Sequence, residues 1–440
     1  MATTWIDLTD AIAWRGHHTG IQRVVYHLAH EFERAGDTRF FVHESRSHRF
    51  VAAESGELPA PAATRRSAPA RTAPWRATAG QGLADAYHRI PAGVRRHVGP
   101  AAKPMALQAI TAGRTAAGVA RRWANDPPTP GKRRLPVVFG ADDTVLVLGA
   151  GWHRPGLLTD LAALKAEIGF RVVHFVHDLI PVMAPQLFGP GHFELIAGYL
   201  MDVVAVADLV LVNSQSTRRD LARFCADINA PMVSVEVVRL ADSLETVDDP
   251  VPPAAAPEPG FLLSVGTVEN RKNHALLYAT YRLARERGIE LPPLVIAGRP
   301  GWNTGDLRYA LEHDPVVAGR ITVLPDIDDH ELAWLYRSCR FTLYPSVYEG
   351  WGMPVAESLV AGKLCLTTDV SSLPEVAGSL IDYFSPFDAG ECLRAITRYL
   401  DDQVLAAKQD EIRTTYRVQT WTDTYRQAAA ALARPVPAAG

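Results

Sequence analysis

The chain has little of what defines several common protein classes. Its 440 residues include four cysteines, Cys225, Cys339, Cys365 and Cys392, which lie far apart and form no CxxC pair. This spacing argues against a structural zinc site and a disulfide framework, and it favours buried free thiols in a reducing compartment. No apolar run is long enough to span a bilayer, and the N-terminus lacks the pattern of a secretory signal. These absences predict a cytoplasmic protein.

Several motifs of nucleotide-dependent, hydrolytic and metal enzymes are also missing. The sequence contains no GxxxxGK[ST], HExxH or GxSxG pattern. One stretch, "LGAGWHRPG" (148–156), begins like a dinucleotide fingerprint but has Arg154 in place of the third glycine. We therefore interpret it as a loop and exclude a nicotinamide cofactor.

The chain as a whole has no large excess of positive or negative charge, but its charges are unevenly distributed along the sequence. The net charge is −3, yet residues 54–134 hold fourteen Lys or Arg against four Asp or Glu, in a stretch rich in Pro, Ala and Gly. A nucleic-acid binder spreads basic charge over a folded face, so no nucleic-acid partner is expected. Two interpretations stay open: a solvated, partly mobile insertion, or a basic surface patch that binds a partner or the anionic lipid at the inner face of the plasma membrane.

What the sequence does have is a repeated strand-and-helix pattern, over a length that implies two domains. Short apolar runs without polar alternation are typical of strands buried on both faces of a parallel sheet. The pattern predicts an α/β protein with two such sheets, joined by the acidic, proline-rich segment 242–260. The runs are "TWIDLT" (4–9), "TVLVLGAG" (144–151), "RVVHFVHD" (171–178), "DLVLVNSQ" (208–215), "FLLSVG" (261–266), "PLVIAG" (293–298), "ITVLP" (321–325), "FTLYPS" (341–346) and "KLCLTT" (363–368).

The stretch "YPSVYEGWGMPVAESLVAG" (344–362) places two carboxylates around a glycine-rich turn. Pro354 suits the first position of a helix, whose unpaired amides and dipole attract anions. Glu349 precedes the turn, and Glu357 lies about one turn inside the helix. The two carboxylates can therefore face different ends of one ligand, although Glu357 could instead simply complement the helix dipole.

Two further strand ends carry polar residues where parallel sheets bind ligands. In "TVENRKN" (267–273), Arg271 and Lys272 lie beside a predicted helix start, where cations are disfavoured unless an anion binds or water solvates them. Arg23 repeats this anomaly in the first turn of a helix opened by Thr19 and Gly20. The pair His177–Asp178 follows the strand "RVVHFV" (171–176) and is a candidate functional pair rather than a buried core histidine.

These motifs together resemble retaining glycosyltransferases of family four. "EGWGMPVAE" matches the E-x7-E signature of that family, and "SVGTVENRKNH" resembles its Arg-Lys element. "VNSQSTRRDL" (212–221) is similar to the stretch at the end of its N-terminal domain, and "HTGIQRV" and "HDLIP" resemble the bacterial mannosyltransferase-like branch that builds surface polysaccharides. The resemblance covers most of 1–50 and 145–430, but not the basic insertion.

The resemblance implies the GT-B fold, two Rossmann-like domains with parallel sheets facing a central cleft. It implies an acceptor-side N-terminal domain at 1–245, interrupted by the insertion at about 54–135. A nucleotide-sugar-binding C-terminal domain would follow at 246–415. Residues 416–440 would then form a helix that crosses back to the N-terminal domain.

Residue roles also follow from the resemblance. The donor diphosphate would be held by Arg271, Lys272, Gly20 and the backbone around Gly352, Met353 and Pro354. The catalytic set would comprise Glu349, His177, Asp178, Arg271 and Lys272, with Glu349 beside the donor sugar, His177 near sugar and acceptor, and Asp178 a candidate base or orienting group. Glu357 would bind the ribose hydroxyls. Two cations and a helix start can stabilise a departing diphosphate without a metal, so no metal and no cofactor are expected.

The sequence thus predicts a retaining, metal-independent hexosyltransferase of surface polysaccharide or glycoconjugate assembly. Its partners would be a nucleotide-sugar donor and a glycan or lipid-linked saccharide acceptor. The mannosyltransferase-like motifs favour GDP-mannose, but UDP- and dTDP-sugars stay open because Asp326 replaces a glycine common near the base-binding loop of the family. The alternative is a non-catalytic nucleotide-sugar-binding subunit of a polysaccharide assembly complex.

Overall fold

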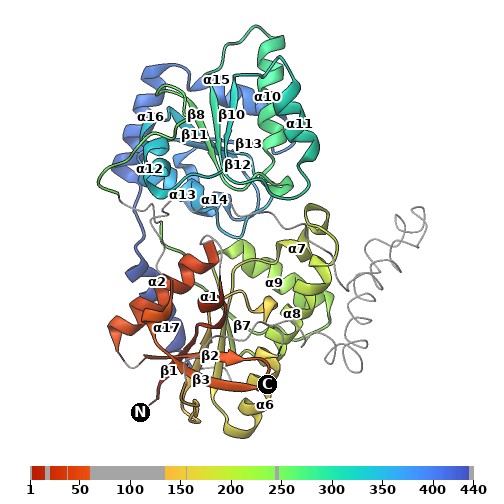
Figure 1. Ribbon diagram of the computed structural model, residues 1–440, viewed down its shortest axis with the longest axis vertical. Coiled ribbons are helices and arrows are strands. Elements are labelled where there is room, and N and C mark those ends of the chain that lie inside the picture. Colours follow the sequence, from red (N-terminus) through yellow and green to blue (C-terminus); the bar gives the residue numbers. More distant parts are fainter. Residues whose placement is uncertain are drawn as a thin grey trace, which may run out of the picture.

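The computed structural model describes residues 2–14, 20–36, 38–59, 134–154, 156–242 and 247–435. The predicted basic insertion therefore lies, from residue 60 to residue 133, outside the described residues, and so does Thr19. Figure 1 shows two α/β lobes, with the N-terminal half of the chain (red to green) below and the C-terminal half (green to blue) above.

The N-terminal lobe contains one sheet, which in the described residues has the strand order β3-β2-β1-β4-β5-β6-β7. Its strands pair in parallel except β3, which runs antiparallel to β2. The central strands are buried on both faces, which is why they read as continuous apolar runs. The strands are β1 (Thr4–Asp7), β2 (Thr38–Glu44), β3 (Arg49–Ala53), β4 (Thr144–Val147), β5 (Arg171–Val176), β6 (Leu209–Val212) and β7 (Ser234–Val237).

Helices cover this sheet and begin at the carboxyl ends of its strands. A short helix, α1, follows β1 directly and was not predicted; the Asp7 carboxylate accepts a hydrogen bond from the amide of Thr9 at its start, at 3.0 Å. The helices of the lobe are α1 (Thr9–Ala13), α2 (Gly20–Ala35), α6 (Leu157–Ile168), α7 (Ile180–Met183), α8 (His192–Val206) and α9 (Gln215–Asp227).

The C-terminal lobe is built on a second, fully parallel sheet. From residue 247 on, the described chain gives the strand order β10-β9-β8-β11-β12-β13. The strands are β8 (Leu262–Val265), β9 (Leu294–Ala297), β10 (Ile321–Leu324), β11 (Phe341–Tyr344), β12 (Cys365–Thr368) and β13 (Tyr383–Phe384). The helices of this lobe are α10 (His274–Glu286), α11 (Gly305–His313), α12 (Asp329–Ser338), α13 (Met353–Val360), α14 (Leu373–Ala377), α15 (Ala389–Arg398) and α16 (Asp402–Thr415), and α17 (Trp421–Leu432) follows them in the chain.

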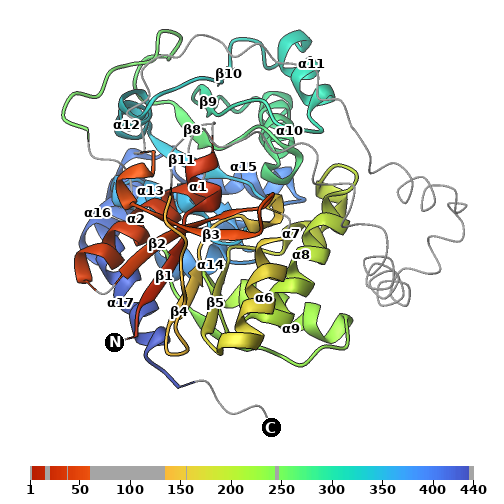
Figure 2. The same cartoon turned by 60° about the horizontal axis from the view of Figure 1, so that its bottom comes forward.

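The last helix, α17, lies against α2 of the N-terminal lobe, as Figures 1 and 2 both show. The ring of Trp421 stacks on His27 with centroids 4.7 Å apart, and Tyr425 meets Phe32 edge-to-face at 4.8 Å. A single cluster of buried apolar residues continues through both lobes. The chain thus connects the two lobes twice, once through 242–260 and once through the segment before α17.

All four cysteines fall in described ranges and are buried and free, which confirms the prediction of buried thiols. No helix among the described residues is both long enough and apolar enough to cross a bilayer. The domain bounds predicted at 245 and 415 stay predictions.

Candidate active site between the lobes

The site is organised around Glu349, in the loop that connects β11 to α13. Its side chain is buried, and one carboxylate oxygen, Oε1, accepts hydrogen bonds from Tyr344 at 2.8 Å and Ser346 at 2.7 Å. The Nζ atom of Lys272 lies 2.6 Å from the same oxygen, and Nη1 of Arg271 lies 2.6 Å from the other. A buried carboxylate is stable only with such partners.

Arg271 and Lys272 belong to a 3-10 turn, Asn270–Lys272, that precedes α10. The turn ends at Asn273, a residue in the left-handed conformation (φ 56°) whose side-chain amide donates to the carbonyls of Pro345 and Pro386, at 3.1 and 2.8 Å. Nη2 of Arg271 also lies 2.7 Å from the Glu269 carboxylate. The two cations therefore stand just outside the helix, fixed by the loop that carries Glu349.

The electrostatics of this cluster keep Glu349 ionised. Burial by itself raises the pKa of the Glu349 carboxyl, but the charges of Arg271 and Lys272 outweigh it and hold that pKa at about 2. Burial lowers the pKa of Lys272, and the Glu349 carboxylate opposes this shift. Glu349 is therefore suited to stabilise positive charge or accept hydrogen bonds, and not to donate a proton as a general acid.

The turn before α13 has the geometry expected of an anion site, with one small difference. Gly352 has φ 116°, a conformation that side chains rarely adopt, and Met353 takes the first helical position, so Pro354 is second rather than first. Across the lobe interface, a Cβ added to Gly20 would lie 2.8 Å from the Met353 methyl carbon. The starts of α2 and α13 therefore meet, which brings together two elements predicted to hold one diphosphate.

Glu357 lies deeper and connects to both lobes. Its Oε2 accepts a hydrogen bond from the Tyr336 hydroxyl at 2.8 Å, and its Oε1 lies 3.5 Å from Nη1 of Arg23 on α2. Arg23 also reaches Asp329 at 3.6 Å. Burial raises the pKa of Glu357, and Arg23 opposes that shift. Arg23 is thus a cation from the N-terminal lobe placed beside a carboxylate of the other lobe.

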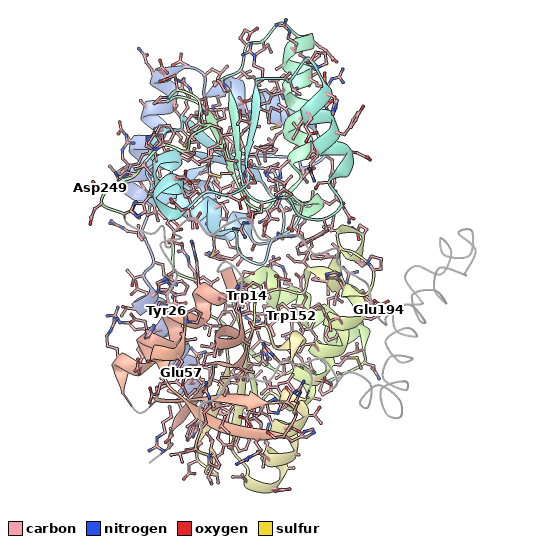
Figure 3. All side chains as sticks on the ribbon, in the orientation of Figure 1. Trp14, Tyr26, Glu57, Trp152, Glu194 and Asp249 are labelled. Carbon is pink, nitrogen blue, oxygen red and sulfur yellow. The ribbon has the colours of Figure 1, made fainter. Side chains whose placement is uncertain are left out.

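His177 and Asp178 line a cavity of about 240 Å³, and Arg271 of the C-terminal lobe lines the same cavity. Nε2 of His177 contacts the Leu148 carbonyl at 2.8 Å, and burial lowers the pKa of this histidine to about 4. Burial also raises the pKa of Asp178, against the charge of Arg271. Most other lining residues are apolar or aromatic and come from the N-terminal lobe; they include Trp152, which Figure 3 labels, Phe175, Ile180, Phe188, His192 and Tyr199.

Gly350 brings the two lobes into direct contact at this cavity. A Cβ added there would clash with the His177 carbonyl oxygen and lie 2.9 Å from Cβ of Asp178. A second contact closes the rim, where Nε1 of Trp302 donates to the Leu187 carbonyl at 3.1 Å and its ring lies 5.8 Å from that of Phe188. The predicted site residues of the two lobes thus face one shared region.

Sequence reasoning missed several members of the cluster. Tyr344 and Ser346 end the strand run "FTLYPS", and Glu269 precedes Arg271 in "TVENRKN", so their position at the sheet edge was a usable signal. Arg23 was noticed as an anomaly but not assigned to the site. Its partner Glu357 is more than 300 residues away, and no spacing rule links the two.

The C-terminal half of the site lies in a segment that matches a known protein family. Residues 248–416, which contain Arg271, Lys272, Glu349 and Glu357, match the family described as "Glycosyl transferases group 1". The chain contains a glycosyltransferase group 1 domain. This finding confirms the predicted resemblance to the family-four enzymes.

Curated relatives include mannosyltransferases. The chain is 27% identical over 283 residues to the serotype-specific mannosyltransferase WbdA of Escherichia coli, a match that covers 60% of this chain and 34% of WbdA. It is 28% identical over 241 residues to the O-antigen chain mannosyltransferase B of Escherichia coli, covering 53% of this chain and 62% of the relative. The chain therefore spans about a third of the first of these relatives and less than two thirds of the second.

Solved structures with the same arrangement cover nearly the whole chain. Sucrose-phosphate synthase from Thermosynechococcus elongatus aligns with a TM-score of 0.58 at 17% identity, over 98% of both chains. HepE from Anabaena, solved with UDP and glucose, aligns with a TM-score of 0.56 at 12% identity, over 98% of this chain and 99% of HepE. At these identities the likeness concerns the fold alone, and it confirms the GT-B architecture that the resemblance implied.

Proposed function

We propose that this protein is a retaining glycosyltransferase that moves mannose from GDP-mannose to a glycan or lipid-linked saccharide acceptor, in the assembly of a surface polysaccharide or glycoconjugate. The group 1 domain supports glycosyl transfer, and the relatives named as mannosyltransferases support mannose as the donor sugar. One observation carries the proposal: Arg271, Lys272 and Glu349 form a single buried cluster beside the start of α13, facing His177 and Asp178.

On this proposal, the C-terminal lobe handles the donor. Breaking the sugar–phosphate bond places negative charge on the departing diphosphate and positive charge on the sugar ring. Arg271, Lys272 and the amides at the start of α13 would stabilise the diphosphate, and the ionised Glu349 would steady the ring or hold its hydroxyls. Glu357 would accept hydrogen bonds from ribose. Because two cations already supply the charge, the proposed reaction runs without a metal ion.

The N-terminal lobe would then receive the acceptor. Its cavity wall, lined by aromatic and apolar side chains, suits the apolar faces of sugar rings, and His177 and Asp178 stand at its inner end. Because burial raises the pKa of Asp178, this carboxyl is better suited than Glu349 to take a proton from an acceptor hydroxyl, or to orient that hydroxyl.

The choice of nucleoside base concerns residues at the ends of β9 and β10. Asp326, which replaces the common glycine, is exposed and lies 3.2 Å from Arg299, also an exposed side chain. This pair follows β9 and β10 at the same sheet edge as Arg271. The assay therefore compares GDP-mannose with UDP- and dTDP-sugars.

The decisive assay is transfer by the purified chain. We expect GDP-mannose to be consumed in the presence of EDTA, and NMR to show the same anomeric configuration in donor and product. If the nucleotides bind but no donor sugar is hydrolysed or transferred, the result would instead support the non-catalytic binding subunit.

Membrane contact through residues 54–134 is a separate part of the proposal. Sedimentation with vesicles containing an anionic lipid should fall at high salt, because salt screens the attraction between basic residues and anionic lipid. A chain lacking 60–133 that sediments equally well would remove this contact from the account.

A further inference from the structure

The start of α9, residues 213–220, touches the loop of Glu349 from the other lobe. The Tyr348 hydroxyl donates to the Asp220 carboxylate and lies 2.8 and 2.9 Å from its two oxygens. The Thr217 hydroxyl donates to the Gly350 carbonyl at 3.4 Å. The residues immediately before and after Glu349 are therefore both bound to one helix of the N-terminal lobe.

A second contact reaches Glu349 through its backbone. The Glu349 amide donates to the Ser371 hydroxyl at 2.8 Å, and the Ser372 hydroxyl donates to the Glu349 carbonyl at 3.0 Å. The next residues form α14, and the Glu375 carboxylate on that helix accepts hydrogen bonds from the first two amides of α9, at 2.6 and 2.7 Å. Unpaired amides at a helix start favour such an anion.

The start of α9 is itself anchored to the strand end that carries His177. The side-chain amide of Asn213 donates to the His177 carbonyl at 2.7 Å, and the Thr217 hydroxyl donates to the Asn213 side chain at 3.0 Å. Ser214 caps the helix by accepting from the Thr217 amide at 3.0 Å. One short segment therefore binds both the Glu349 loop and the His177–Asp178 edge.

We infer that residues 213–220 set the position of Glu349 relative to His177 and Asp178, so that docking of the lobes completes the catalytic arrangement. Asp220, Tyr348 and Glu375 are positioning residues in this arrangement, because none of them contacts the reacting region itself. The inference rests on the proposed function and gives a role to the stretch "VNSQSTRRDL", for which the resemblance supplied only a place in the chain.

This role differs measurably from simple adhesion between the lobes. Misplacing a catalytic group lowers kcat and should leave the binding of a nucleoside diphosphate nearly unchanged, because Asn273 still anchors the turn of Arg271 and Lys272 to the carbonyls of Pro345 and Pro386. A displacement of about 1 Å can cost about a hundredfold in rate. Losing only the hydrogen bond between Tyr348 and Asp220 should cost less, because Ser371 and Ser372 still hold the backbone of Glu349.

The test is a cycle of Tyr348→Phe, Asp220→Ala and the double variant, with kcat and donor KM measured for GDP-mannose. We expect each single change to lower kcat about tenfold with little change in KM, and the double variant to be no worse than either, since both break one hydrogen bond. Asp220→Asn keeps an acceptor oxygen and should retain most of the rate. Tyr309→Phe, an exposed tyrosine on α11, and Asp410→Ala on α16 are the matched controls.

Binding and exchange measurements complete the design. GDP should bind the Tyr348→Phe and Asp220→Ala variants as it binds the unmodified chain, and Glu375→Ala should speed hydrogen exchange at the amides of Gln215 and Ser216. Unchanged kcat in both single variants, or rate losses that simply multiply in the double variant, would overturn the inference. If the unmodified chain turns over no nucleotide sugar, the proposed function fails instead.

Discussion

The two walls of the interlobe cavity differ in the kind of residue that forms them. On the C-terminal side, Arg271 lines the cavity, and behind it Arg271 and Lys272 are both paired with the buried carboxylate of Glu349. On the N-terminal side, the wall is mainly aromatic and apolar, and burial keeps His177 neutral by lowering its pKa to about 4. A phosphate needs the first kind of surface, and an uncharged sugar acceptor is compatible with the second. On the proposed function, this contrast places the donor on the C-terminal lobe and the acceptor on the N-terminal lobe.

One carboxyl group from each lobe shows a similar contrast. The pKa of Glu349 is held at about 2 by its two cations, whereas burial raises the pKa of Asp7, at the end of β1, to about 6. Asp7 accepts hydrogen bonds from Thr9 that oppose this shift without cancelling it. The two carboxyls thus have opposite proton affinities, because the charges of Arg271 and Lys272 outweigh burial at Glu349, whereas burial dominates at Asp7.

The largest expected effect comes from removing a cation from the charged wall. Arg271→Ala and Lys272→Ala should each lower kcat/KM by about 10²–10³-fold, because each removes charge stabilisation of the leaving diphosphate. Steady-state kinetics measure this loss, and circular dichroism checks the fold, since Glu349 loses a buried partner. Arg285→Ala, an exposed arginine on α10, is the control. Turnover at the level of the unmodified chain in both variants would contradict the assignment of this wall.

A smaller effect is expected from the arginine that connects the lobes. Arg23→Ala leaves Glu357 and Asp329 without their shared cation, so two carboxylates would face an anionic donor. We expect the donor KM to rise about tenfold, the cost of one charged contact, with a smaller change in kcat. A change in the acceptor KM alone would show that Arg23 acts on the acceptor side, which would contradict its assignment to the donor.

A substitution in the aromatic wall should change the KM of the acceptor and not the KM of the donor. Phe188 is half-buried at the cavity rim beside Trp302. Phe188→Ala should raise the KM of whichever acceptor supports transfer about fivefold, since part of an apolar contact is lost, and leave the donor KM unchanged. Measuring both constants in one series separates the walls, and an effect on the donor KM alone would show that they are not distinct.

The smallest effect concerns stability. Because the folded-state pKa of Asp7 is raised from 3.8 to about 6, its contribution is fully present below about pH 4 and is lost as pH rises through about 6, at a cost of up to about 3 kcal/mol. Asp7→Asn should therefore raise Tm by a few degrees at pH 8 and much less at pH 4. An equal shift at both pH values would show that Asp7 carries no such penalty.

Much of the fold was readable because the strands are uninterrupted apolar runs. β5, β9 and β11 lie within the predicted segments, and their polar successors His177 and Glu349 follow from the rule that ligands bind at strand ends. The short helix α1 was missed because five residues carry too weak a periodic signal, and its start depends on the side chain of Asp7.

The contacts between lobes could not be predicted in the same way. Arg23 meets Glu357, and Glu375 meets the start of α9, only because two separately folded sheets stand in one relative orientation. Neither pair shares a helix or a strand, so neither periodicity nor spacing relates its members. The pairing of Glu349 with Arg271 and Lys272 was closer to prediction, since all three follow adjacent strands of one sheet.

The central claim is that Arg271, Lys272 and the start of α13 bind one diphosphate, and titration calorimetry tests it most directly. GDP, UDP and dTDP are each compared with the corresponding monophosphate, in the unmodified chain and in the Arg271→Ala/Lys272→Ala variant. The account predicts that at least one diphosphate binds more tightly than its monophosphate, and that this difference disappears in the variant. A difference that survives the loss of both cations would contradict the account.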